Sequence, residues 1–126
     1  LVHVERVDWL VSLLEDAELE MLSIPRLVAE AKARNLALER FPIVDVSIPT
    51  DANAAWSLAR RAADAVRAGR HVVFHCRGGL GRAGTMAACT LVELGVEPED
   101  AIRRVRDVRP GAIETQAQET FVQSRG

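Results

Sequence analysis

A cysteine and an arginine with five residues between them lie in the segment VVFHCRGGLGRAGT, positions 72–85. A cysteine thiolate is a strong nucleophile, and the planar fork of an arginine can hold two oxygens of a phosphoryl group at once. The glycines between Cys76 and Arg82 permit a tight curl in which successive backbone N–H groups face an anion. The spacing therefore predicts a phosphate-binding loop with a nucleophilic sulfur at its base.

The residues on either side of this loop favour the same chemistry. The segment RHVVFH predicts a strand that ends at the cysteine, and the apolar run from Ala83 to Leu94 predicts a central, buried helix. The N-terminus of that helix would favour both an anion and the thiolate form of Cys76. We expect the phosphoryl oxygens to be bound by Arg77, Gly78, Gly79, Leu80, Gly81 and Arg82.

Two other glycine motifs overlap the loop. Gly79, Gly81 and Gly84 match the G-x-G-x-x-G of dinucleotide-binding folds, which also need a second strand ending in an acidic residue about 20 residues later. The corresponding segment, VEPEDAIRRVRDV, is predicted to be helical. A nucleotide P-loop needs lysine directly before its Thr, and glycine precedes Thr85. Neither motif accounts for the stretch as fully as the cysteine and arginine do.

Phosphoryl transfer to sulfur also needs an acid that protonates the leaving oxygen. The segment FPIVDVSIPTD offers Asp45 and Asp51. Asp45 ends an apolar, β-rich run and is the preferred candidate. Asp51 directly precedes a predicted helix, where an N-cap role explains it without catalysis, although it remains the second candidate for the acid.

The segment HCRGGLGRAG resembles the signature of cysteine-dependent protein phosphatases, which is His-Cys, five residues and Arg. From roughly position 7 to position 122, through the tail motif GAIET, the chain is similar to the kinase-associated phosphatases, a dual-specificity group. The resemblance implies hydrolysis through a phosphocysteine, with Cys76 as nucleophile, Arg82 as phosphate ligand and Asp45 as general acid. It also implies that no metal and no cofactor take part.

The same resemblance implies supporting roles for residues around the loop. His75 would orient the loop through hydrogen bonds, and Gln118 aligns with a glutamine near the active site. The family usually has Ser or Thr directly after the arginine, where the hydroxyl stabilises the departing thiolate. This chain has Ala83 at that position and Thr85 two residues later, so turnover of the phosphocysteine is the step in question.

The substrate class is left open by the loop alone. Several basic residues inside the loop would favour a polyanion such as an RNA 5′-phosphate or a phosphoinositide. This loop has only Arg77 before Arg82. A non-catalytic module that binds phospho-residues or docks on a kinase is a second alternative, which Ala83 favours weakly. Arsenate reduction would need exposed resolving cysteines, and Cys89 lies in the helix predicted to be buried. We expect a phosphorylated protein as substrate, on tyrosine or on serine and threonine, with a kinase as a candidate partner.

Composition and charge narrow the class of protein and the kinds of partner that we expect. A chain of 126 residues with 48% hydrophobic and 27% charged residues fits one soluble globular domain. The formal net charge of -2 gives no electrostatic case for nucleic acid or a membrane surface. Two cysteines make no disulfide scaffold, so we expect a reducing, cytoplasmic location. His3 and His71 show no metal-ligand spacing, and a start at Leu1 fits a truncated N-terminus.

The order of predicted elements indicates a three-layer α/β domain over residues 1–126, with a central, mostly parallel sheet and helices on both faces. Strands are expected at 7–14, within 39–51 and at 70–75. Helices are expected at 24–38, around 56–66, at 83–94, at 98–108 and at 113–124.

Overall fold

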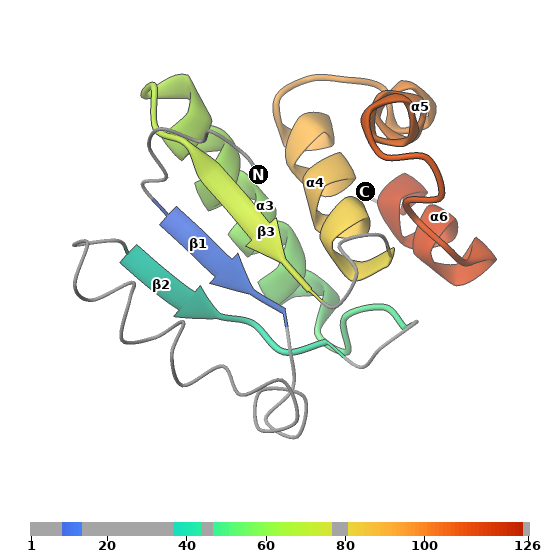
Figure 1. Ribbon diagram of the computed structural model, residues 1–126, viewed down its shortest axis with the longest axis horizontal. Coiled ribbons are helices and arrows are strands. Elements are labelled where there is room, and N and C mark those ends of the chain that lie inside the picture. The colour runs from blue at the N-terminus through green and yellow to red at the C-terminus, as the bar shows by residue number, and fades with distance from the viewer. Residues whose placement is uncertain (1–8, 14–36, 44–46, 77–80, 125–126) are drawn as a thin grey trace.

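The computed structural model describes residues 9–13, 37–43, 47–76 and 81–124 of the chain. Figure 1 shows their arrangement. In chain order the elements are β1 (Trp9–Ser12), β2 (Ala37–Arg40), α3 (Ala52–Arg67), β3 (Val72–His75), α4 (Gly81–Glu93), α5 (Pro98–Val108) and α6 (Gln116–Gln123).

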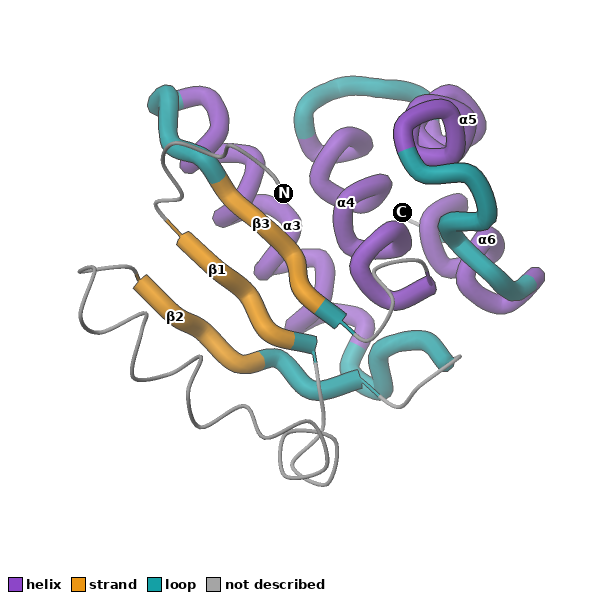
Figure 2. Tube along the Cα trace, in the orientation of Figure 1, coloured by secondary structure: helices purple, strands orange, loops and turns teal. Residues whose placement is uncertain are grey.

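The three strands form a parallel sheet in the order β2-β1-β3 (Figure 2). Ser12 at the end of β1 lies opposite Arg40 on one side and His75 on the other, so all three strands end at the same edge. The segments that follow stay together there. Leu13 N–H donates to the His75 carbonyl at 2.8 Å, and Ile43 N–H donates to the Leu13 carbonyl at 3.0 Å.

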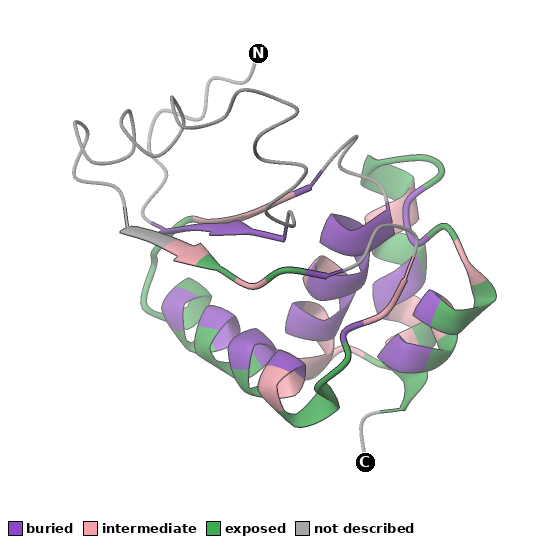
Figure 3. Ribbon diagram, turned by 90° about the horizontal axis from the view of Figure 1, so that it is seen from below, coloured by how far each residue is buried: buried purple, intermediate pink, exposed green. Residues whose placement is uncertain are grey.

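Helices α3 and α4 cover the same face of the sheet, and α5 and α6 pack against α4 on its far side (Figures 1 and 3). The first ten residues of α4 are buried except Ala87, because neighbours surround the helix on most sides. Trp56 of α3 stacks on Phe121 of α6 with ring centroids 5.8 Å apart. The expected central, buried helix is therefore confirmed, as is the α/β class.

Local signals account for the starts of two helices. The Asp51 side chain accepts a hydrogen bond from Ala54 N–H at 3.0 Å and caps α3, as its position before a helix predicts. Pro98 opens α5, where its missing N–H costs nothing, and Glu99 and Asp100 follow in the first turn.

Two expectations about the chain's course are wrong in part. A helix was expected to run through Leu38, yet Ala37–Arg40 forms β2, because pairing with β1 outweighs the helical propensity of Ala and Leu. The rest of that expected helix lies outside the described residues. The spacing of Ile102, Val105 and Val108 predicts one buried stripe on α5, yet Val108, in the last turn, is 78% exposed.

Candidate active site

Cys76 directly follows β3 and is buried, with 7% of its surface exposed. The backbone N–H of Ala83, in the first turn of α4, donates to its sulfur at 3.3 Å. An N–H donor and the positive end of a helix both stabilise negative charge on sulfur. The structure thus places the expected nucleophile at a helix N-terminus.

Arg82 lies in the same turn and is 1% exposed. Its Nη1 donates to the Ile43 carbonyl at 3.0 Å and lies 3.5 Å from the Leu13 carbonyl, which it also contacts as a donor. Those carbonyls follow β2 and β1, so the guanidinium is anchored where the strands end. Buried charges need such polar partners because desolvation is costly. Binding of a phosphoryl group by Arg82 stays a prediction.

Several expected site residues lie outside the described residues. They are the loop residues Arg77, Gly78, Gly79 and Leu80 and the preferred acid, Asp45. Their roles stay predictions. Within the described part of the chain, β3 and α4 bring Cys76, Gly81, Arg82 and Ala83 together around one helical turn.

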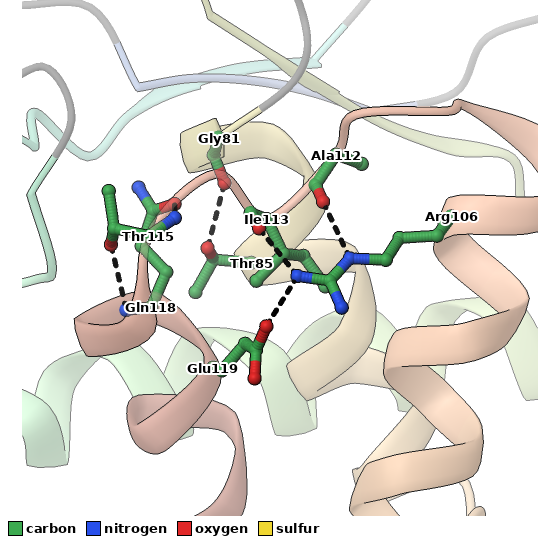
Figure 4. A network of polar contacts seen from close by, with 8 residues as sticks. All are labelled: Gly81, Thr85, Arg106, Ala112, Ile113, Thr115, Gln118 and Glu119. Carbon is green, nitrogen blue, oxygen red and sulfur yellow. Dashed lines mark hydrogen bonds and ion pairs between the residues drawn. The ribbon is translucent and has the colours of Figure 1, made fainter.

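Thr85 does not offer its hydroxyl proton to the sulfur. The side chain is 1% exposed, and Oγ1 donates to the Gly81 carbonyl of its own helix at 2.7 Å (Figure 4). Ala83, whose N–H reaches the sulfur, has no hydroxyl at all. Among the described groups of this turn, the backbone N–H of Ala83 is therefore the candidate to stabilise a departing thiolate.

His75 ends β3 directly before the cysteine and is half-buried. Burial disfavours the imidazolium form, and the positive charge of Arg82 adds to the effect, so the pKa of His75 lies below its ordinary value of 6.5. The ring is therefore neutral at pH 7, where it can both donate and accept a hydrogen bond.

Gln118 is fully buried and joins two distant segments. Its Nε2 donates to the Ser47 carbonyl at 3.0 Å, two residues beyond Asp45 in the chain. Its Oε1 accepts from Thr115 N–H at 3.1 Å, and its own N–H donates to Thr115 Oγ1 at 3.1 Å (Figure 4). Gln118, oriented by this capping box at the start of α6, thus contacts the segment that follows the predicted acid.

Glu114 also belongs to this site, although its residue type and spacing did not single it out. A Cβ placed on Gly81 would overlap Glu114 Oε1 and would lie 3.1 Å from Gln118 Nε2. The Glu114 side chain therefore crosses the first residue of α4, and a larger residue than glycine there would displace the Glu114 carboxylate. The available sequence signal was the tail motif GAIET, which contains Glu114.

Arg106 fixes the turn that carries Glu114. Its Nε donates to the Ala112 carbonyl at 3.0 Å, and Nη2 donates to the Ile113 carbonyl at 2.8 Å and to Glu119 at 2.7 Å (Figure 4). Ile113 has a φ of 58°, which is unfavourable for a β-branched residue and persists where its surroundings impose it. Arg106 supplies part of that constraint.

The second cysteine is poorly placed for chemistry. Cys89 is fully buried within α4, and burial raises the pKa of its thiol, with Glu93 adding to the effect. Across the described ranges, no three His, Cys, Asp or Glu side chains gather as metal ligands would. Among the described helices, none combines the length and apolar character needed to cross a membrane.

Comparison with known proteins gives consistent matches. The family model "PTP-SAK: Swiss Army Knife protein, DSP-PTPase phosphatase domain" matches residues 6–122. Cyclin-dependent kinase inhibitor 3 of Rattus norvegicus is 33% identical over 108 residues, which are 83% of this chain and 50% of that protein. Protein tyrosine phosphatase type IVA 3 of Homo sapiens is 49% identical over 45 residues, which are 36% of this chain and 26% of that protein.

Two solved structures have the same fold. Kinase associated phosphatase, with serine in place of its catalytic-site cysteine, superposes with a TM-score of 0.82 at 28% identity, covering 92% of this chain and 66% of that one. Tk-PTP in its active form gives 0.82 at 32% identity, covering 97% and 82%. The chain spans about half the length of the cyclin-dependent kinase inhibitor 3 proteins that it matches. The chain belongs to the PTP-SAK family and is a phosphatase domain of the dual-specificity and tyrosine phosphatase type.

Proposed function

We propose that this domain hydrolyses phosphate monoesters on proteins through a phosphocysteine formed on Cys76. The observation that carries the proposal is the contact between the Cys76 sulfur and the Ala83 N–H, in the turn that also carries Arg82. A sulfur at a helix N-terminus beside an arginine suits attack on phosphorus.

In the first step the Cys76 thiolate attacks phosphorus, and a P–S bond forms as the bond from phosphorus to the substrate oxygen breaks. Asp45 gives its proton to that oxygen, which leaves as an alcohol or phenol. Arg82 and the N–H groups of the loop hold the three remaining oxygens, whose negative charge they offset.

In the second step water attacks the phosphocysteine. Asp45, now a carboxylate, takes a proton from the water, and the P–S bond breaks with its electron pair returning to sulfur. The products are inorganic phosphate and the free thiolate. The Ala83 N–H is the described donor that faces the sulfur as this charge returns.

The relatives, more than the geometry, support the proposed substrate class. We infer a phosphorylated protein, with phosphotyrosine or phosphoserine and phosphothreonine as the modified residue, because the matched relatives include a protein tyrosine phosphatase and a kinase associated phosphatase. The name of the kinase associated phosphatase also makes a kinase the candidate partner. A phosphoinositide or RNA 5′-phosphate substrate and a non-catalytic binding role remain the alternatives.

Two broader points belong to the same proposal. Residues 1–126 act as a single phosphatase domain, in which the sheet edge, α4 and α6 together build the site. The cytoplasm is the proposed location, because a nucleophilic thiol must stay reduced to act.

The substrate proposal is tested by phosphate release, in the presence of a chelator, from phosphotyrosine and phosphothreonine peptides, a phosphoinositide and RNA 5′-triphosphate. Hydrolysis of a phosphopeptide well above the other two supports the proposal. Preference for either polyanion would reverse the substrate class, and no release from any substrate would favour the binding module.

The acid is tested separately with Asp45→Asn and Asp51→Asn. The proposal expects Asp45→Asn to slow phenyl phosphate far more than p-nitrophenyl phosphate, since the poorer leaving group needs the proton more. The same selective loss in Asp51→Asn alone would move the acid to Asp51 and leave its N-cap role as a second function.

A further inference from the structure

Glu114 brings a carboxylate to the turn that carries the proposed nucleophile. A Cβ on Gly81 would overlap Glu114 Oε1, so this side chain lies directly against the first residue of α4. The Cys76 sulfur accepts from Ala83 N–H, two residues further along the same helix. A phosphoryl group on that sulfur and the Glu114 carboxylate would therefore share one helix end.

The backbone on both sides of Glu114 is fixed. Before it, Arg106 binds the carbonyls of Ala112 and Ile113 at 3.0 and 2.8 Å. After it, Thr115 is locked by the capping box with Gln118. The main chain at Ile113 also packs closely on α4, since a Cβ on Gly84 would lie 3.2 Å from Ile113 N. The main chain on both sides of Glu114 thus directs its exposed side chain to this turn.

We propose that Glu114 is a specificity-determining residue that disfavours substrates carrying further negative charge beside the scissile phosphate. This inference rests on the proposed function and deepens it. A negative charge at this helix end repels a second phosphate, whereas an isolated phosphomonoester meets the loop donors and Arg82 with a smaller penalty. The site would therefore select a singly phosphorylated residue over a polyphosphate or a phosphoinositide.

The test compares inorganic phosphate with tripolyphosphate as competitive inhibitors of p-nitrophenyl phosphate hydrolysis. Glu114→Gln should strengthen inhibition by tripolyphosphate roughly three- to tenfold more than inhibition by phosphate, as expected for removing one nearby charge in a wet site. Glu114→Lys should shift the ratio further in the same direction, and raising the salt concentration should shrink both shifts.

Glu99 supplies the matched control. It is an exposed glutamate in the first turn of α5, outside the described contacts of the site, so Glu99→Gln and Glu99→Lys make the same charge changes elsewhere. These variants should leave the ratio of the two inhibition constants unchanged. Equal shifts in the Glu99 and Glu114 series, or an unchanged ratio in Glu114→Lys, would overturn the inference.

Failure of the inference can be separated from failure of the proposed function. If the parent protein hydrolyses no phosphate ester, the proposed function fails, and calorimetric binding of the same two anions to the Cys76→Ser variant, with and without Glu114→Gln, still tests the role of Glu114. If hydrolysis is normal and the ratio does not move, only the role of Glu114 is wrong.

Discussion

The backbone N–H of Ala83 donates to the sulfur of Cys76 at 3.3 Å, across seven positions of the chain. The first turn of α4 thus lies against the sulfur. A single N–H and the helix end are the described groups that stabilise negative charge there. Because charge resides on this sulfur before attack and again after hydrolysis, the contact bears on both half-reactions of the proposed mechanism.

Ala83→Ser should raise the steady-state rate by supplying the hydroxyl that this turn lacks. A charge-assisted hydrogen bond to the departing sulfur is worth about 1.5–3 kcal/mol, or roughly ten- to a hundredfold in the rate of dephosphorylation. In rapid mixing with p-nitrophenyl phosphate, the parent should release a burst of nitrophenol that shrinks in the variant, with the burst rate little changed.

Thr85→Val is the matched control for that experiment, because it deletes the other hydroxyl of the same turn, which donates to the Gly81 carbonyl. It should leave the burst in place. A parent enzyme without a burst, combined with slow turnover in Thr85→Val, would show that Thr85 already stabilises the leaving sulfur.

Arg82→Lys should lose most of the phosphatase activity even though the positive charge is kept. An ammonium cannot reproduce the planar fork, so two charge-assisted bonds of roughly 1.5–3 kcal/mol each are weakened and activity falls about a hundredfold or more. The melting temperature should fall as well, because the Ile43 carbonyl loses its 3.0 Å donor. Inhibition by phosphate, measured well below the melting temperature, separates the two effects. Undiminished phosphate affinity would show that Arg82 serves only to anchor the strand ends.

Gln118→Met tests whether the bond to Ser47 holds the acid in place. Methionine keeps the buried volume but cannot donate to the Ser47 carbonyl, so the segment after Asp45 loses its tether. Hydrolysis of phenyl phosphate should fall roughly tenfold more than that of p-nitrophenyl phosphate, a part of the 10²–10⁴ that general acid catalysis supplies.

Thr115→Ala provides the comparison for Gln118→Met. It removes the hydroxyl of the capping box, at about 0.5–2 kcal/mol of stability, and keeps the bond from Gln118 to Ser47. Hydrolysis of phenyl phosphate and of p-nitrophenyl phosphate by this variant should slow equally or not at all. If both variants shift the leaving-group dependence alike, general loosening of α6 explains the effect and the tether does not.

The sequence predicted the elements around the loop because their signals are local. The spacing of Cys76 and Arg82, the strand before them and the apolar run of α4 all lie within one short stretch. Pro98 and Asp51 likewise act on the helix directly beside them. Each of these signals needs only its own neighbours to take effect.

Contacts between distant segments could not be predicted in this way, because they depend on how the elements pack together. The strand at Leu38 forms through pairing with β1, and its own residues favour a helix. The Arg106 side chain of α5 likewise reaches across to the turn before α6, a contact that its own helix does not reveal. Glu114 meets Gly81 for the same reason, through the packing of two helices that the residue pattern does not encode.

His75 should make stability depend on pH in a defined window. Its folded-state pKa is lowered from 6.5 by burial and by Arg82, so the unfolded chain takes up the proton first as the pH falls. The stabilising contribution of the neutral His75 ring to the free energy of unfolding is intact above pH 6.5. It is lost progressively below that pH, down to the lower folded-state pKa. Urea unfolding of the parent and of His75→Asn should show a difference that changes across this window. A constant difference would contradict the lowered pKa.

The central claim is that Cys76 is the nucleophile of a metal-free phosphatase, and it is tested most directly by hydrolysis of p-nitrophenyl phosphate in the presence of a chelator. The parent should turn over at its full rate. Cys76→Ser should lose turnover by at least about a thousandfold while still binding inorganic phosphate, because the loop donors are largely backbone groups. Full activity in Cys76→Ser, or loss of parent activity on chelation, would contradict the account.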